Sequence, residues 1–227
     1  MKAAVHTRYG PPDVVRVVDV PTPSAMDHDV LVNVHATTVN RTDCGIRGAK
    51  PFFIRVFTGL VRPRVTILGN EFAGQVAAVG PAVTSFAVGD RVFGYDDTAF
   101  GAHAQYMTIR EDASLAKIPA NLTYAQAAPA TEGSHYALAN IKKAKIRAGQ
   151  GVLVNGGTGA IGSAAVQVLA SRGVHVTATP RTWSLCVAWA PNGSSTAPWR
   201  TSRRTSRPMT QCSTRSERAR SAGAGDC

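Results

Sequence analysis

The sequence contains no apolar run of about 18 residues, the length that a helix needs to cross a bilayer, so we expect no membrane span. The first residues, MKAAVHTRYGPPDV, lack the apolar segment of a secretory signal, and we expect a cytoplasmic protein. The six histidines are scattered along the chain and show no metal-ligand spacing. Cys44, the one cysteine in residues 1–180, has no histidine at metal-ligand spacing, so we expect a small, buried or half-buried side chain there.

The net charge of +11 is distributed unevenly along the chain. Residues 181–227 hold eight arginines, no lysine and only two acidic residues, so this segment carries more than half of the excess positive charge. Binding to nucleic acid or to acidic lipid is one hypothesis for such a segment. Its arginines show neither helical spacing nor an RNA-binding motif, and we therefore expect no nucleic-acid partner.

Residues 151–179 (GVLVNGGTGAIGSAAVQVLASRGVHVTAT) carry the strongest functional signal in the chain. Residues 152–154 predict a short buried strand, residues 163–171 a helix, and residues 174–179 a second strand. Three glycines between the first strand and the helix have the spacing GxGxxG: Gly157, Gly159 and Gly162. This spacing indicates dinucleotide binding when it lies in a strand-turn-helix-strand unit, which is the context that the sequence predicts.

Glycine is needed in such a turn for three physical reasons. The turn requires a positive φ, the backbone must approach a pyrophosphate closely, and the helix must pack tightly on its strand. The free N–H groups and partial positive charge of the helix N-terminus then favour phosphate. The candidate dinucleotide-binding residues are Gly157, Thr158, Gly159, Ala160, Ile161, Gly162, Thr179 and Arg181. A glycine turn with a purely structural role is the alternative.

The choice of dinucleotide depends on the end of the second strand, where an acidic residue would bind the adenosine ribose of NADH. Residues 176–179 (VTAT) contain no acidic residue, and Arg181 follows. Because a 2′-phosphate repels carboxylates and attracts cations, we predict NADPH as the cofactor, with NADH as the less favoured alternative.

Residues 1–120 indicate mainly β structure, because runs rich in β-branched residues alternate with turns that contain glycine and proline. The predicted strands are residues 2–5, 14–20, 30–39, 72–79, 91–95 and 104–109. Many short strands with glycine corners favour a small barrel. Helical patterns follow, with Asn121 as the expected cap of a helix near Thr123 and a second helix at residues 134–144.

Further motifs occur in an order that resembles one enzyme superfamily. They are residues 39–43 (VNRTD) with Arg47, residues 67–80 (ILGNEFAGQVAAVG), residues 86–94 (FAVGDRVFG), and residues 128–133 (APATEG) with Ala137 and Leu138. With the glycine turn, they resemble the medium-chain dehydrogenase/reductase superfamily, and within it the zinc-free quinone oxidoreductase branch. The resemblance covers residues 1 to about 180.

The resemblance implies an α/β plus β fold, with a GroES-like catalytic barrel at residues 1–122 and a truncated Rossmann domain at residues 123–180. It implies an NADPH-dependent oxidoreductase that transfers hydride to a quinone or an enone held between the domains. Asn40 would lie near the active site and Thr131 near the nicotinamide, with a structural role as the alternative for each. Nothing in the sequence nominates a general acid. Relatives of this kind are often homodimers.

Zinc-dependent members of the superfamily use a cysteine and a histidine among their catalytic ligands. Alignment of the motifs places Asn40 at the first of these positions and Asn70 at the second. Zinc prefers thiolate, imidazole and carboxylate ligands, so neither amide suits it. The family's structural zinc lobe of four cysteines is also missing from residues 1–180. The resemblance therefore predicts a mechanism without zinc.

Residues 181–227 depart from the superfamily pattern, which would continue with further strand and helix units. Arginine without lysine, beside many serines and alanines, is typical of GC-rich DNA translated in an unselected frame. When each codon is read from the third base of the one before, Trp189-Ala190 must give glycine and Met209-Thr210 must give aspartate. We hypothesise a frameshift near codon 180, which would leave a disordered tail and a non-functional fragment.

This hypothesis predicts that resequencing codons 170–227 from independent template will reveal one base gained or lost. The restored frame should then encode segments that resemble GLGA and DAVGK, which the superfamily pattern calls for. An unchanged sequence across these codons would contradict a sequencing error and leave a genuine mutation of the gene as the explanation.

Overall fold

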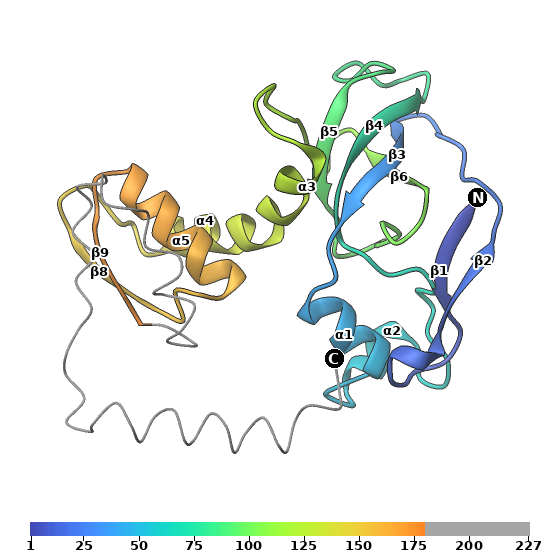
Figure 1. Cartoon of the computed structure of the whole chain (residues 1–227), viewed down its shortest axis with the longest axis horizontal. Coiled ribbons are helices and arrows are strands. Elements are labelled where there is room, and N and C mark those ends of the chain that lie inside the picture. The colour runs from blue at the N-terminus through green and yellow to red at the C-terminus, as the bar shows by residue number, and fades with distance from the viewer. Residues whose placement is uncertain (180–227) are drawn as a thin grey trace. The chain divides into compact units, whose positions relative to one another are not determined.

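The computed structural model describes residues 1–179, which form two compact units (Figure 1). The first unit takes in Met1–Pro129, and the second begins at Ala130. The segment 181–227, with its expected disorder and the hypothesis of a frameshift, lies outside the described residues, as does Arg181. Within residues 1–179, no helix has both the length and the apolar character that a bilayer crossing requires.

A curled antiparallel sheet of five strands, in the order β6-β3-β4-β5-β7, is the centre of the first unit (Figure 1). Its strands are β3 (Asp29–Thr37), β4 (Glu71–Val79), β5 (Arg91–Tyr95), β6 (Tyr106–Arg110) and β7 (Ser114–Lys117). A separate hairpin pairs β1 (Lys2–His6) with β2 (Val15–Asp19). The six predicted strands are present, whereas β7 is a strand that the sequence analysis missed.

The main core of this unit lies on one face of the sheet, to which alternate strand residues point. Val30 and Val32 of β3 and Phe72 of β4 are completely buried there, together with residues from β5 and β6. The predicted alternation of β3 is therefore confirmed. Two register shifts between β3 and β4, at Leu31/Val32 and at Val34/Ala36, bend the sheet into its curled form.

Three short α-helices complete the first unit: α1 (Arg41–Gly48), α2 (Ile54–Thr58) and α3 (Tyr124–Ala127). Of these three helices, the sequence pattern predicted only α3, and the expected cap of α3 was wrong. Thr123, not Asn121, caps α3, because its hydroxyl accepts from the Gln126 N–H while the Gln126 side chain accepts from the Thr123 N–H. This helix contacts β3 and β4 and so packs with the first unit, which takes in residues up to Pro129. The domain boundary expected after residue 122 stays a prediction.

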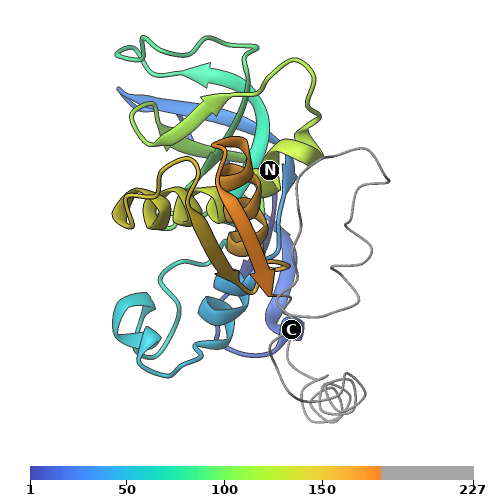
Figure 2. The ribbon, with the colours of Figure 1, turned by 90° about the vertical axis from the view of Figure 1, so that its left-hand side faces the viewer.

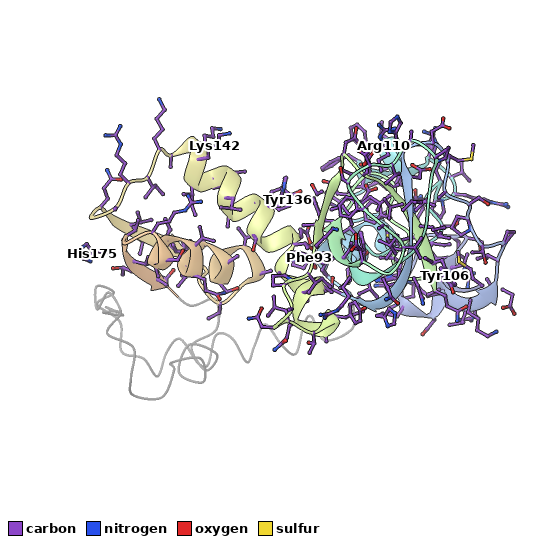
Figure 3. All side chains as sticks on the ribbon, turned by 90° about the horizontal axis from the view of Figure 1, so that it is seen from above. Phe93, Tyr106, Arg110, Tyr136, Lys142 and His175 are labelled. Carbon is purple, nitrogen blue, oxygen red and sulfur yellow. The ribbon has the colours of Figure 1, made fainter. Side chains whose placement is uncertain are left out.

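The second unit contains the strand-turn-helix-strand order that the sequence predicted (Figure 2). Strands β8 (Gly151–Asn155) and β9 (His175–Thr179) pair in parallel, and α5 (Ala160–Ser171) connects them. The helix starts at Ala160, three residues before the expected start. Apolar side chains of α5 pack on β8 and β9 and on α4 (Glu132–Lys143), whose basic last turn includes Lys142 (Figure 3).

One carboxylate fastens the loop after β4 to the end of β6. Glu111 Oε2 accepts hydrogen bonds from the backbone N–H groups of Thr84 and Ser85, both at 3.0 Å, and Oε1 lies 3.3 Å from Nδ1 of His28. These bonds, above all the two from the backbone, lower the pKa of Glu111 from 4.5 to about 2. The carboxylate therefore contributes stability above its unfolded pKa, and that contribution is lost as the pH falls toward 2.

We expect Glu111→Gln to lower the urea midpoint at pH 7, because the amide replaces charge-assisted hydrogen bonds with weaker ones. The difference from the wild type should shrink as the pH falls from about 5 toward 2, where the wild-type carboxyl becomes protonated. Urea titrations followed by circular dichroism at several pH values measure this. The exposed Asp13→Asn is the matched control for loss of one charge. A difference between Glu111→Gln and the wild type that stays constant with pH would contradict the assignment.

Candidate functional site

Asn40 lies between β3 and α1 and caps that helix with a reciprocal pair of interactions. Its Oδ1 accepts hydrogen bonds from the backbone N–H groups of Thr42 and Asp43, at 2.9 and 3.2 Å. In return, the backbone N–H of Asn40 donates to Oδ2 of Asp43 at 3.0 Å. This capping box satisfies amides at the start of α1 that have no partner within the helix.

The other end of the Asn40 amide points toward the start of β4. Its Nδ2 donates to Oδ1 of Asn70 at 2.7 Å and lies 3.4 Å from Oε2 of Glu71. That same carboxylate oxygen accepts a hydrogen bond from the hydroxyl of Thr38 at 2.6 Å. Residues thirty positions apart in the sequence therefore form one polar cluster, in which Asn70 and Glu71 are buried.

Asp43 and His103 connect this cluster to the backbone around it. The buried Asp43 accepts the backbone N–H of Gly69 at its Oδ1, at 2.8 Å. Its Oδ2 lies 3.9 Å from Nε2 of His103, which is 2.8 Å from the carbonyl oxygen of Thr38. The loop before β4, the start of α1 and the end of β3 are thus joined through a single carboxylate. We expect this arrangement to hold the amides of Asn40 and Asn70 rigidly.

The two amides at the positions of zinc ligands, Asn40 and Asn70, are therefore in direct contact. An amide nitrogen is a hydrogen-bond donor and cannot ligate a metal, and the oxygen of each side chain accepts a hydrogen bond in the cluster. No group of three His, Cys, Asp or Glu side chains within residues 1–179 is placed to hold a metal ion. Cys44 is half-buried, as its sequence context predicted, and forms no disulfide bond within residues 1–179.

The glycine turn of the second unit connects β8 to α5. Gly156 has a φ of +79°, so the left-handed position precedes the three glycines that the sequence analysis singled out. A Cβ on Gly162 would lie 2.2 Å from the carbonyl oxygen of Gly156, a distance that no side chain tolerates. Gly162 is therefore required for the close approach of α5 to the turn.

Gly159 has a different role in the same turn. It is the N-cap of α5, its φ is −81°, and a Cβ there would make only an ordinary contact of 3.5 Å with Gly156. The N-cap residue makes no side-chain hydrogen bond to the first amides of this twelve-residue helix, which have no acceptor within the helix itself. Ala160 and Ile161 form the first turn of that helix, and Thr158 lies in the turn before it. A pyrophosphate fits these features, since it needs free N–H groups and close backbone approach.

Thr179 ends β9 beside the glycine turn. Its carbonyl oxygen accepts the N–H groups of Gly156 and Gly157, at 2.9 and 2.8 Å. Its hydroxyl donates to Oδ1 of Asn155 at 2.6 Å, which joins the ends of the two parallel strands. The structure therefore brings Thr179 and the glycines together, as a dinucleotide site requires.

Thr131 stands at the N-cap position of α4 in this second unit, without a side-chain cap bond to the helix. Two residues later, a Cβ on Gly133 would lie 2.8 Å from the carbonyl oxygen of Ala160. The start of α4 thus touches the start of α5, and Thr131 belongs to the same unit as the glycine turn. Asn40 belongs to the first unit, and the expected roles of Asn40 near the active site and of Thr131 near the nicotinamide stay predictions.

Comparison with known proteins gives matches in both units. Residues 26–120 match the family of the alcohol dehydrogenase GroES-like domain. Human quinone oxidoreductase is 33% identical over 187 residues, which cover 80% of this chain and 53% of the human protein. The 2-methylene-furan-3-one reductase of Solanum lycopersicum is 31% identical over 176 residues, which cover 74% of this chain and 44% of that protein. The chain thus spans about half the length of these curated relatives.

A solved structure of a mycobacterial protein in complex with NADPH is also similar to this chain. It has a TM-score of 0.72 and 29% sequence identity, and the match covers 99% of this chain and 64% of the mycobacterial one. The predicted GroES-like fold followed by a Rossmann unit is therefore confirmed for the described residues, with the first sheet present as a curled half-barrel.

The capping box predicts that Asn40→Ala lowers the free energy of unfolding by about 1–2 kcal/mol, because α1 loses its side-chain cap. Asn40→Ser should cost less, since serine retains an oxygen that can cap the helix. Urea unfolding at pH 7 measures both variants. Equal losses for Ala and Ser would show that the cap contributes little and that the bond to Asn70 accounts for the effect.

Proposed function

Because the chain belongs to the medium-chain dehydrogenase/reductase superfamily, in its quinone oxidoreductase-like branch, we propose that it is built to reduce a quinone or an enone with NADPH. The names of its relatives support both acceptors, since one is a quinone oxidoreductase and the other reduces a methylene-furanone. We also propose that the protein is cytoplasmic and that its partner is a small-molecule quinone or enone, as the sequence led us to expect.

The observation that carries the proposal is the glycine turn at the uncapped start of α5. Gly159 leaves the start of the helix without a side chain, and Gly157 and Gly162 allow the close packing of the turn on β9 and α5. The amides of Ala160 and Ile161 lie in the first turn of α5, where a pyrophosphate would bind. When bound, the reduced dinucleotide supplies the hydride. The protein supplies position and hydrogen bonds.

Thr179 supports NADPH over NADH. An acidic side chain at the end of β9 would bind the ribose of NADH, and the hydroxyl of Thr179 is instead bonded to Asn155. The similar mycobacterial protein was solved with NADPH. A neutral side chain at this position leaves room for a 2′-phosphate without charge repulsion.

On this proposal, Asn40 and Thr131 contribute from different units. Asn40 holds its amide in a buried polar cluster near the acceptor, and Thr131 lies beside the turn that binds the dinucleotide. Asn40 and Asn70 stand where zinc-dependent members of the superfamily have metal ligands, which supports a mechanism that polarises the acceptor by hydrogen bonds.

The test compares the melting temperature of the full chain with and without NADPH, and with NADH at the same concentration. A ligand present at 100 times its dissociation constant raises the free energy of unfolding by about 2.7 kcal/mol. We expect NADPH to raise the melting temperature more than NADH does. A flat response to both dinucleotides would overturn the proposal and favour the non-functional fragment.

Two glycine variants make this test specific to the turn. Gly159→Val should fold normally, because a side chain there meets only an ordinary contact, and yet its isopropyl group should block the pyrophosphate and abolish the NADPH-induced shift. Gly162→Val should lower the melting temperature even without ligand, because its side chain would collide with Gly156. An unchanged NADPH response in Gly159→Val would place the dinucleotide elsewhere.

A further inference from the structure

Asn70 contains a hydrogen-bond donor that the fold leaves without a partner. The residue is completely buried, and its Oδ1 accepts from Asn40. Its Nδ2, by contrast, contacts no acceptor among the described residues. This amide group therefore lies next to the predicted active-site residue and has both of its N–H bonds unused.

The orientation of the Asn70 amide follows from the backbone of α1. Two backbone N–H groups donate to Oδ1 of Asn40, so the oxygen of that side chain must face the helix and its nitrogen must face Asn70. A nitrogen of Asn40 at 2.7 Å requires an oxygen on Asn70. The capping box thus fixes both amides, and rotating Asn70 to satisfy its own nitrogen would bring two donors together.

A buried donor without an acceptor destabilises a fold, and an apolar side chain of similar size would avoid the penalty. Leucine has nearly the shape of asparagine, and Asn40 would still lie 3.4 Å from the carboxylate of Glu71. Stability alone therefore gives no reason for an amide at position 70. A buried donor without a partner in a native fold calls for an explanation, and a catalytic role is one such explanation.

We propose that Nδ2 of Asn70 donates a hydrogen bond to the carbonyl oxygen of the acceptor, which makes Asn70 a catalytic residue for the proposed reduction. This inference rests on the proposed function. The carbonyl oxygen of a quinone or an enone gains negative charge as the acceptor is reduced, and a fixed N–H donor stabilises that charge. Asn70 transfers no proton, because an amide stays neutral. The reduced dinucleotide supplies the hydride, and solvent water supplies the proton that neutralises the oxygen. Asn40 is its positioning residue.

The first test is direct observation of the Asn70 side-chain amide by ¹⁵N NMR of the full chain, with cyclohexanone as the probe. This ketone accepts a hydrogen bond, and without a dinucleotide it undergoes no reduction. The signal is assigned by its loss in Asn70→Leu. We expect cyclohexanone to shift the Asn70 amide protons and to leave those of the exposed Asn121 unchanged. If the chemical shifts of the Asn70 amide protons do not change at the highest cyclohexanone concentration, the inference is overturned.

The second test separates catalysis from folding. We expect Asn70→Leu to keep or raise the melting temperature and to keep the NADPH-induced shift, since the dinucleotide site lies in the other unit. Reduction of duroquinone should fall about 100-fold in kcat/KM, as for loss of one oxyanion donor. Asn121→Leu is the matched control. Unchanged kcat/KM in Asn70→Leu would overturn the inference.

These readouts keep the two proposals apart. A chain without any NADPH response would fail the proposed function, and the NMR titration would still decide whether Asn70 binds a carbonyl. A chain that reduces duroquinone equally well with leucine at position 70 would uphold the proposed function and reject the role of Asn70.

Discussion

The hydrogen bond between the amides of Asn40 and Asn70 is the interaction on which the candidate site depends. It connects the end of β3 with the start of β4, and it can form only because α1 holds the oxygen of Asn40. A backbone requirement, the capping of a helix, thereby orients a side chain thirty residues away in sequence. In a zinc-binding protein, a metal ion could connect two such strand ends through its ligands. In this chain, a hydrogen bond between two neutral amides connects them.

Charge is treated differently in the two units. In the first, Glu71 and Asp43 are buried, and each accepts hydrogen bonds from neighbours that also shape the site. In the second, the turn contains no charged side chain, and binding would depend on backbone amides and the helix dipole. The first unit therefore positions polar side chains by buried hydrogen bonds, whereas the second presents backbone amides at the start of a helix.

Local patterns explain which elements the sequence could predict. Alternating valines identified β3, and glycine spacing identified the turn before α5, because both signals repeat within a few residues. The helix α1 was missed although Asn40 and Asp43 have capping-box spacing, since its eight residues contain two glycines and little apolar periodicity. The cap of α3 was misplaced because Thr123 and Gln126, and not Asn121, form the reciprocal pair.

The sequence by itself determined the type of each unit and the residue types available at each site: glycines at the turn, amides in place of zinc ligands, and a neutral Thr179. These properties are local, and so a single stretch of chain reveals them. Only the tertiary structure decided that Asn40 meets both Asn70 and Glu71, and that Nδ2 of Asn70 has no acceptor among the described residues. Such facts depend on the register of β3 against β4, which brings distant residues together and which no local pattern specifies.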